Sequence, residues 1–248
     1  MNKELVKRKF GRVVSSYGQA AVMQQLIAKR LFGMLHGDCY NRVLEIGCGS
    51  GFLTKLWSEN IAFTSATIND INESWQQGIA AIMAEKMESW DFIAEDAEDT
   101  EFGEEFDLIL SSNTIQWFNN PATFIKRMYD KLATGGVLLI SSFGVDNFKE
   151  IREVSGSGLR YYSSGELVSK LPMGCVTDMA TECVEMDFES VNDLLKHLKS
   201  TGVNAVDATI KSRGELQRFI EEYTTKFSCE TGKVRLTYNP LYLKIIKI

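Results

Sequence analysis

The sequence predicts an α/β protein with a mostly parallel sheet and helices on both of its faces. Between residues 42 and 141, five short runs rich in apolar and β-branched residues alternate with helix-length segments. The chain of 248 residues contains no internal repeat, low-complexity tract or glycine-serine linker. Its hydrophobic content of 44% is ordinary for a globular protein. These features favour one domain with a single sizeable core.

The N-terminal segment 1–36 is predicted to form one or two amphipathic helices. Its apolar residues recur with a helical period and precede the first strand. They are Val22, Met23, Leu26, Ile27, Leu31 and Met34.

The five central runs are predicted strands, each followed by a helix-length segment. They span residues 42–46, 63–68, 90–94, 106–110 and 136–141. This alternation is typical of βαβ units, which place their strands in parallel. Ligands of such sheets bind beyond the carboxyl ends of the strands, so the loops that follow the strands are the candidate site.

The pattern changes towards the C-terminus, where a strand at 175–188 and a final one at 234–246 flank two helices. Four apolar residues share one face of the first helix: Val191, Leu194, Leu195 and Leu198. The second helix begins with a capping box formed by Ser212 and Glu215. We therefore expect a single domain over 1–248. Its core comprises 37–188 and 232–248, and a helical insertion at 189–231 serves as a lid.

The composition argues against several classes of protein. Five scattered cysteines, two histidines and the lack of a Cys-x-x-Cys pair argue against a disulfide framework and a metal site. A net charge of -6 disfavours nucleic acid as the main partner. No apolar run approaches the roughly 18 residues of a membrane helix, and the N-terminus lacks a signal-peptide core. A cytoplasmic protein without membrane contact is expected.

The first central strand runs directly into a glycine loop, Gly47-Cys48-Gly49-Ser50-Gly51, which leads into a helix start. Glycine permits both a tight turn and the close approach of a ligand to the backbone. The third glycine comes one residue too early for the fingerprint of dinucleotide-binding proteins. An acid, Glu45, stands two residues before the first glycine.

This loop resembles the first motif of class I S-adenosylmethionine-dependent methyltransferases. The resemblance implies a Rossmann-like fold with a mostly parallel seven-stranded sheet, and S-adenosylhomocysteine as product. It implies that Asp70 accepts both ribose hydroxyls, that Asp96 contacts the adenine amino group, and that Ala97 lies beside the ring. The alternative to a role of Asp96 in adenine binding is that it is a solvated acidic residue in a loop. The implied cofactor residues are Glu45, Gly47, Cys48, Gly49, Gly51, Asp70, Ile71, Asp96, Ala97, Ser111, Ser112 and Asn113.

A second set of motifs is narrower and spans nearly the whole chain. Its main members are the Gln116-Trp117-Phe118 segment and the block from His197 to Ala205. These resemble the malonyl-[acyl-carrier-protein] O-methyltransferases of biotin synthesis. The resemblance implies a malonyl thioester on acyl carrier protein as substrate. Alternatives are another class I small-molecule methyltransferase, acting on trans-aconitate or a quinone precursor, and a nucleotide-binding module without catalysis.

A carboxylate that accepts a methyl group is already ionised at pH 7, so no general base, catalytic triad or metal is expected. The candidate catalytic residues are Gln116, Tyr17, His197 and Arg152. Further candidate partners of the carboxylate are Arg160, Tyr161, Tyr162 and Lys199. The alternative for Tyr17 is that it only packs in the core. The alternative for His197 is that it is a structural helix residue with Asp193, four residues earlier, as its partner.

Two groups of basic residues are candidate contacts for an acidic carrier protein, with a solvated helix face as the alternative. The first group is Lys3, Lys7, Arg8, Lys9 and Arg12. The second group is Lys196, Lys199, Lys211 and Arg213. The sequence carries no signal for an oligomeric state.

Overall fold

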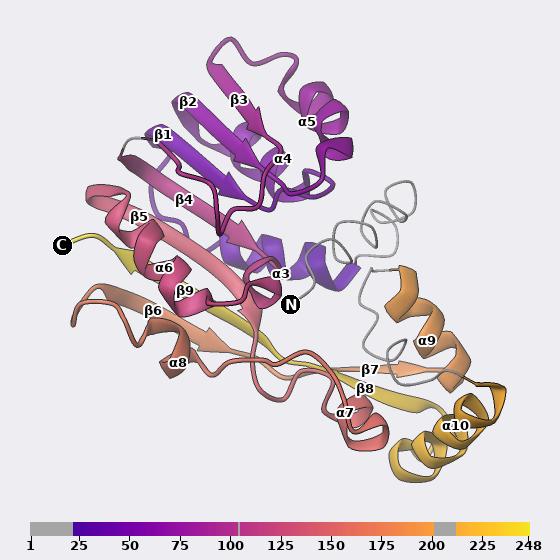
Figure 1. The fold of residues 1–248 in the computed structure, drawn as a ribbon. Helices are drawn as coiled ribbons and strands as arrows, with labels where there is room; N and C mark the ends of the chain where they lie inside the picture. The colour runs from indigo at the N-terminus through magenta and orange to yellow at the C-terminus, as the bar shows by residue number, and fades with distance from the viewer. Residues whose placement is uncertain (1–21, 104, 201–211) are drawn as a thin grey trace.

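The computed structural model describes residues 22–103, 105–200 and 212–248, and its main body is a seven-stranded sheet (Figure 1). The strand order is β3-β2-β1-β4-β5-β9-β6. The strands are β1 (Cys39–Ile46), β2 (Ala62–Asn69), β3 (Ser89–Ile93), β4 (Phe106–Ser112), β5 (Leu132–Phe143), β6 (Val176–Thr181) and β9 (Pro240–Ile246). The first five are parallel, and β9 runs antiparallel to both of its neighbours. The predicted mostly parallel seven-stranded sheet is confirmed.

Helices cover both faces of this sheet because successive strand residues point to opposite sides. On one face, Val43 and Leu139 belong to the core cluster that packs against α3 (Val22–Phe32), α4 (Phe52–Asn60) and α5 (Gln76–Met83). On the other face, Leu44 and Leu138 pack with α6 (Pro121–Asp130) and α8 (Ser164–Val168). Two short 3-10 turns, η1 (Glu73–Trp75) and η2 (Ile115–Trp117), follow β2 and β4. Strands buried on both faces explain the continuous apolar runs in the sequence.

The expectation of one long strand at 175–188 and another at 234–246 is wrong, because each is interrupted. After β6 and before β9, the chain forms a separate antiparallel pair, β7 (Val184–Phe188) with β8 (Val234–Tyr238). Asn239 marks the break between β8 and β9: its Nδ2 donates to the Glu182 carbonyl at 2.6 Å, and its Oδ1 accepts from Asp146 N at 3.1 Å. Pro240, which lacks an N–H, then begins β9.

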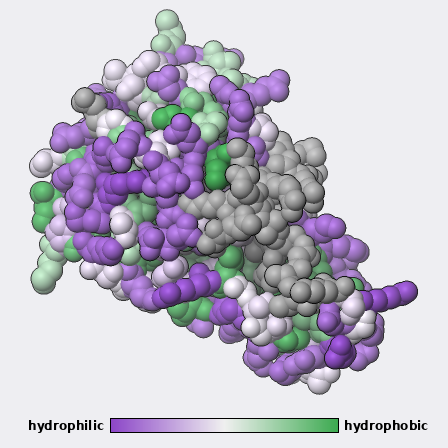
Figure 2. Space-filling model, viewed as in Figure 1, coloured by the Kyte–Doolittle hydropathy of each residue, from purple (hydrophilic) through white to green (hydrophobic). Residues whose placement is uncertain are grey.

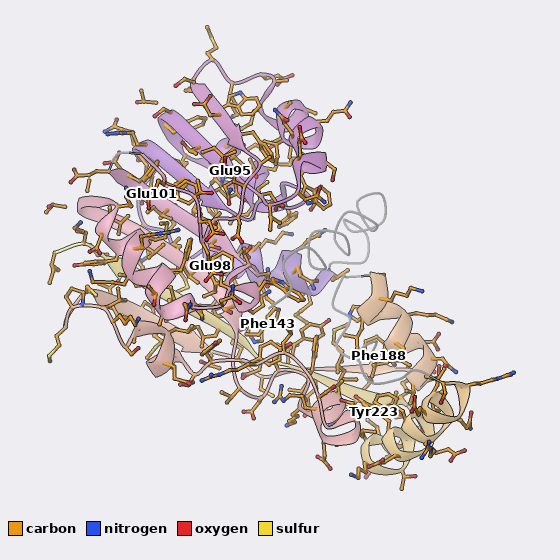
Figure 3. All side chains as sticks on the ribbon, in the orientation of Figure 1. Glu95, Glu98, Glu101, Phe143, Phe188 and Tyr223 are labelled. Atoms are coloured by element: carbon orange, nitrogen blue, oxygen red, sulfur yellow. The ribbon has the colours of Figure 1, made fainter. Side chains whose placement is uncertain are left out.

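The second sheet carries α7 (Lys149–Ser155), α9 (Val191–Ser200) and α10 (Arg213–Phe227), as Figure 1 shows. The predicted capping box is present: Ser212 Oγ accepts from Glu215 N, and the Glu215 carboxylate accepts from Ser212 N. Tyr223 anchors α10 by donating its hydroxyl to the Arg235 carbonyl at 2.6 Å. The second sheet and these three helices are called the second module below. Figure 3 shows Phe188 and Tyr223 in this module and Phe143 at the end of β5 that faces it. A lid role for 189–231 stays a prediction.

The face of the molecule in Figure 2 is largely hydrophilic, with apolar residues scattered among polar ones. Among the described residues, no helix is long and apolar enough to cross a membrane. The same residues contain no cluster of histidine, cysteine and acidic side chains that could hold a metal ion.

Candidate cofactor pocket

The glycine loop takes a conformation that only glycine adopts readily. Gly47, Gly49 and Gly51 have φ values of +70°, +50° and +79°. A Cβ on Gly47 would lie 2.3 Å from two side-chain atoms of Thr114, and one on Gly51 would lie 2.4 Å from Ile82 Cδ1. The backbone angle therefore favours glycine at both positions, and at Gly47 the short distance to Thr114 favours it as well.

Hydrogen bonds fix the loop to the end of β2. The N–H groups of Gly47 and Cys48 both donate to the Asn69 carbonyl, at 2.8 and 3.0 Å. Gly49 N donates to Asp70 Oδ2 at 2.9 Å. A Cβ on Gly49 would meet no atom within 4 Å, so this stretch of backbone lies bare beside open space.

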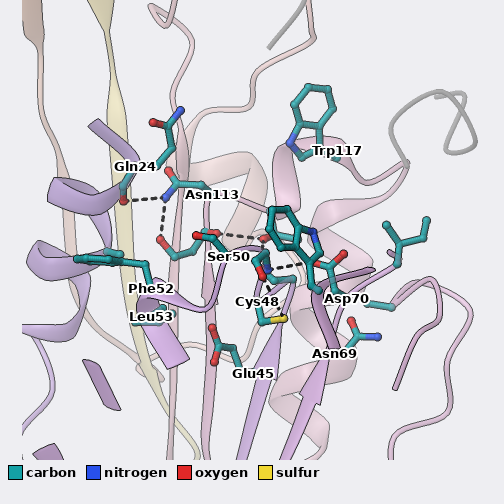
Figure 4. Close-up of a pocket in the computed structure, with 18 of the residues that line it drawn as sticks. Gln24, Glu45, Cys48, Ser50, Phe52, Leu53, Asn69, Asp70, Asn113 and Trp117 are labelled. Carbon is teal, nitrogen blue, oxygen red and sulfur yellow. Dashed lines mark hydrogen bonds between the residues drawn. The ribbon is translucent and has the colours of Figure 1, made fainter. Parts of the chain in front are cut away.

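A pocket opens at the carboxyl ends of the strands, and it brings together most of the predicted cofactor residues (Figure 4). The predicted residues that line it are Glu45, Gly47, Cys48, Gly49, Asp70, Ile71, Asp96, Ala97, Ser112 and Asn113. The two exceptions are Gly51, which turns the chain into α4, and Ser111, whose hydroxyl donates to the Ile46 carbonyl at 3.2 Å. Ser111 thus joins β4 to β1.

Asp70 lies just beyond β2 and is 8% exposed. Besides Gly49 N on Oδ2, its Oδ1 accepts from Asn72 N at 2.8 Å. Burial raises the pKa of Asp70 to about 6, although the two backbone hydrogen bonds favour the ionised form. Each oxygen retains lone-pair capacity for a further donor.

Glu45 forms part of the pocket wall and is 1% exposed. Its Oε2 accepts hydrogen bonds from Thr54 Oγ1 and Trp57 Nε1, both at 2.7 Å. Burial raises the pKa of Glu45 to about 7, and the negative charge of Asp70 adds to this shift. Among the described residues that line the pocket there are three carboxylates and no basic side chain. The pocket is therefore suited to a cationic ligand.

Three of the four candidate catalytic residues, Gln116, Arg152 and His197, do not belong to this lining. Gln116 is 7% exposed; its Nε2 donates to the Asn113 carbonyl at 2.6 Å, and its Oε1 accepts from Ser142 Oγ at 3.4 Å. Arg152 donates to the carbonyls of Val145 and Asn147. Tyr17 lies outside the described residues. Their catalytic roles stay predictions.

His197 lies in the second module, where its Nε2 hydrogen-bonds Tyr238 Oη at 2.7 Å. Its ring centroid is 5.2 Å from that of Phe188, and burial lowers the pKa of the imidazole. Asp193, the partner of His197 in the alternative interpretation, contacts Ser190 and Lys196. His197 thus belongs to a largely neutral polar contact between α9 and β8.

The remaining candidates are also separate from the pocket lining. The Arg160 guanidinium forms an exposed ion pair with Glu166 at 3.3 Å and stacks over the Tyr162 ring at 4.7 Å. The Arg152 guanidinium stacks over the ring of Tyr161 at 5.4 Å. In the second basic group, Lys196 pairs with Asp193 at 3.0 Å. Lys211 and the first basic group, residues 3–12, lie outside the described residues.

Several residues of the pocket were not anticipated. Gln24 on α3, Trp75 in η1 and Thr114 after β4 all contribute to its lining. Gln24 carried one usable signal: it shares the buried face of α3 with Ile27, Ala28 and Leu31, where an apolar residue is the norm. A polar side chain in such a row points to a polar partner or a ligand.

Known proteins match this chain over nearly its whole length. The family model described as a methyltransferase domain matches residues 44–140. A malonyl-[acyl-carrier protein] O-methyltransferase of Haemophilus influenzae is 35% identical, covering 98% of this chain and 94% of the relative. The protein of the same name from Bacteroides helcogenes is 31% identical, covering 98% of both.

Solved structures share the fold at lower identity. A putative methyltransferase from Bacillus halodurans superposes with a TM-score of 0.62 at 20% identity, covering 89% of this chain and 98% of that one. The N-methyltransferase NodS from Bradyrhizobium japonicum, in complex with S-adenosylhomocysteine, gives 0.57 at 14% identity and covers 98% of both chains. These similarities concern the fold alone.

Proposed function

We propose that this chain, which belongs to the malonyl-[acyl-carrier protein] O-methyltransferase family, methylates the free carboxylate of a malonyl group held on acyl carrier protein. The methyl donor is S-adenosylmethionine, and the reaction belongs to early biotin synthesis. The observation that carries this proposal is the 31–35% identity to relatives of that name over nearly the full chain. A cytoplasmic location is part of the proposal, supported by five free cysteines.

The pocket fits the cofactor. Asp70 has lone pairs left for the ribose hydroxyls, and the bare backbone at Gly49 permits close approach of a ligand. Asp96 and Ala97 line the pocket where the adenine is expected. The three carboxylates match the net positive charge of S-adenosylmethionine at neutral pH. When bound, the cofactor supplies a methyl group on a cationic sulfur.

The protein's own contribution is to hold and align the reactants. A carboxylate with a pKa near 4 needs no proton removed at pH 7, so no side chain has to act as a base. Holding oxygen, carbon and sulfur in line contributes roughly 7–11 kcal/mol in well-oriented systems. Trp117 and Phe118 contribute apolar surface to the same pocket. Gln116, Tyr17, His197 and Arg152 remain the proposed groups around the substrate.

The raised pKa values predict how cofactor binding depends on pH. Near pH 6 the empty pocket keeps protons on Glu45, with a pKa of about 7, and partly on Asp70, with a pKa of about 6. A cation favours the ionised carboxylates, so binding releases protons below pH 7. S-adenosylmethionine should bind about tenfold more tightly at pH 8 than at pH 5.5, as titration calorimetry would measure. In the Glu45→Gln variant, the affinity should depend less on pH. An equal change of affinity with pH in the variant and in wild type would contradict this prediction.

The same two carboxyl groups set the pH dependence of stability without cofactor. Because their pKa values are higher in the folded protein than in the unfolded chain, the folded state binds more protons between about pH 4 and pH 7. The free energy of unfolding contributed by these groups therefore falls as the pH rises through that window.

An assay of several acceptors tests the proposed substrate. We expect labelled methyl transfer to malonyl-acyl carrier protein and none to acetyl-acyl carrier protein, which lacks the carboxylate. Trans-aconitate and a quinone precursor represent the other small-molecule methyltransferases of this class. Methyl transfer to either of these two acceptors, with none to malonyl-acyl carrier protein, would contradict the proposed function. It would assign the protein to the other small-molecule methyltransferases.

A further inference from the structure

Asn113, directly after β4, has every polar atom but one engaged. It adopts a left-handed backbone with φ of +54°, which is strained for a residue with a side chain. Its N–H donates to the carbonyl and hydroxyl of Ser141 at 3.2 and 3.3 Å, and its carbonyl accepts from Gln116 Nε2 at 2.6 Å. Its Nδ2 donates to Ser112 Oγ at 2.8 Å and to the Gln24 carbonyl at 3.3 Å. Only Oδ1 is without a hydrogen-bond partner among the described residues.

Gln24 presents a second acceptor of the same kind. It lies on α3, is 8% exposed, and its Oε1 also lacks a donor among the described residues. The hydrogen bond from Asn113 Nδ2 places the two residues next to each other, and Figure 4 shows them together on one wall of the pocket, across from Trp117. Each buried acceptor without a partner costs about 1–3 kcal/mol, and such atoms in native proteins call for an explanation.

The chemistry of these oxygens restricts what they bind. Amide oxygens only accept hydrogen bonds, so they repel the substrate carboxylate and require a donor. None of the described residues that line the pocket is basic, so this part of the chain supplies no cation there. The donors of the cofactor are its adenine amino group, its ribose hydroxyls and its α-ammonium group.

The order of the strands decides between these donors. Asp96 follows β3, Asp70 follows β2, the glycine loop follows β1 and Asn113 follows β4, and these strands are neighbours in that order. With adenine at Asp96 and ribose at Asp70, the amino-acid end of the cofactor passes the glycine loop towards β4. Neighbouring strands lie about 4.8 Å apart, so this step matches the length of the amino-acid chain.

We propose that Gln24 Oε1 and Asn113 Oδ1 together accept hydrogen bonds from the α-ammonium group of the cofactor. The assignment rests on the proposed function, because it presumes S-adenosylmethionine as ligand. It gives α3 a direct part in cofactor recognition. It also gives Gln116 a positioning role in addition to its proposed place near the substrate. Its Nε2 holds the main-chain carbonyl of Asn113 and so orients the side-chain oxygen of that residue.

Calorimetry with two ligands tests the assignment. S-adenosylhomocysteine carries the α-ammonium group, whereas 5′-methylthioadenosine has the same nucleoside without the amino-acid moiety. Gln24→Leu, which keeps the bulk and removes the acceptor, should weaken S-adenosylhomocysteine binding about tenfold and leave 5′-methylthioadenosine binding within twofold of wild type. Unchanged binding of the second ligand also shows that the variant is folded. Gln24→Glu should instead tighten S-adenosylhomocysteine binding alone.

Two results would overturn the assignment: an unchanged affinity of Gln24→Leu for S-adenosylhomocysteine, or an equal loss for both ligands. Asn113→Gly, which suits the positive φ, should show the same selective loss. Gln116→Leu should give a smaller loss with the same selectivity, since it acts through Asn113. If the wild-type protein bound neither ligand, the proposed function itself would fail, and the assignment with it.

Discussion

Replacing Gly47 with alanine is expected to abolish cofactor binding and to lower the free energy of unfolding by about 3 kcal/mol. The left-handed φ of +70° costs an alanine about 1–2 kcal/mol. The added Cβ would also lie 2.3 Å from Thr114, which forces the loop or the side chain to move. Urea denaturation and calorimetry with S-adenosylhomocysteine measure the two effects.

Gly49→Ala is the matched control. It has a similar left-handed φ of +50°, but its Cβ would meet no atom within 4 Å. Its loss of stability should therefore stay near 1–2 kcal/mol, while the methyl group enters the pocket and weakens cofactor binding. Removing the obstructing side chain in a Gly47→Ala/Thr114→Gly variant should recover part of the lost stability. A Gly47→Ala protein as stable as wild type would contradict the account of the loop.

Asp70→Ala is expected to weaken cofactor binding by about 2–3 kcal/mol, because it removes the acceptor of the ribose hydroxyls. The structure adds a second reason, since Asp70 also holds the N–H groups of Gly49 and Asn72. Calorimetry with a 2′-deoxy analogue of the cofactor separates the two contributions. The variant should lose less affinity for this analogue than for the full ligand.

Asp70→Asn is the companion variant, because it keeps the size of the side chain and one acceptor oxygen. Its affinity should fall between those of wild type and Asp70→Ala. An unchanged affinity in Asp70→Ala would remove this residue from the cofactor site.

The sheet and the glycine loop were predictable because their signals are local in the sequence. Buried parallel strands give continuous apolar runs, and the loop spacing follows directly after one of them. The capping box of α10 was readable for the same reason, since Ser212 and Glu215 are three residues apart.

The interruption of the last strands was not predictable, because its cause is distant in the chain. Asn239 ends β8 through contacts to Asp146, Asn147 and Glu182, which lie 57 to 93 residues away. Pro240 is a local mark of this break because it cannot donate to a neighbouring strand, but nothing within residues 234–246 indicates the distant partners. The apolar residues of this segment therefore predict a single strand.

The surroundings of the candidate catalytic residues were equally hidden. The residue type of Arg152 favoured an anion partner, yet the structure shows its guanidinium on two main-chain carbonyls and one aromatic ring. Gln116 was singled out through a resemblance, and its contacts to Asn113 and Ser142 depend on how β4 and β5 pair. Such contacts follow from tertiary packing, which residue type and spacing do not specify.

The most direct test of the central claim is intact-mass spectrometry of malonyl-acyl carrier protein after incubation with this protein and S-adenosylmethionine. We predict a gain of one methyl group, located on the malonyl carboxylate by fragmentation of the released thioester arm, and no gain with the Gly47→Ala protein. An unmodified carrier protein, or a methyl group on any other atom, would contradict it.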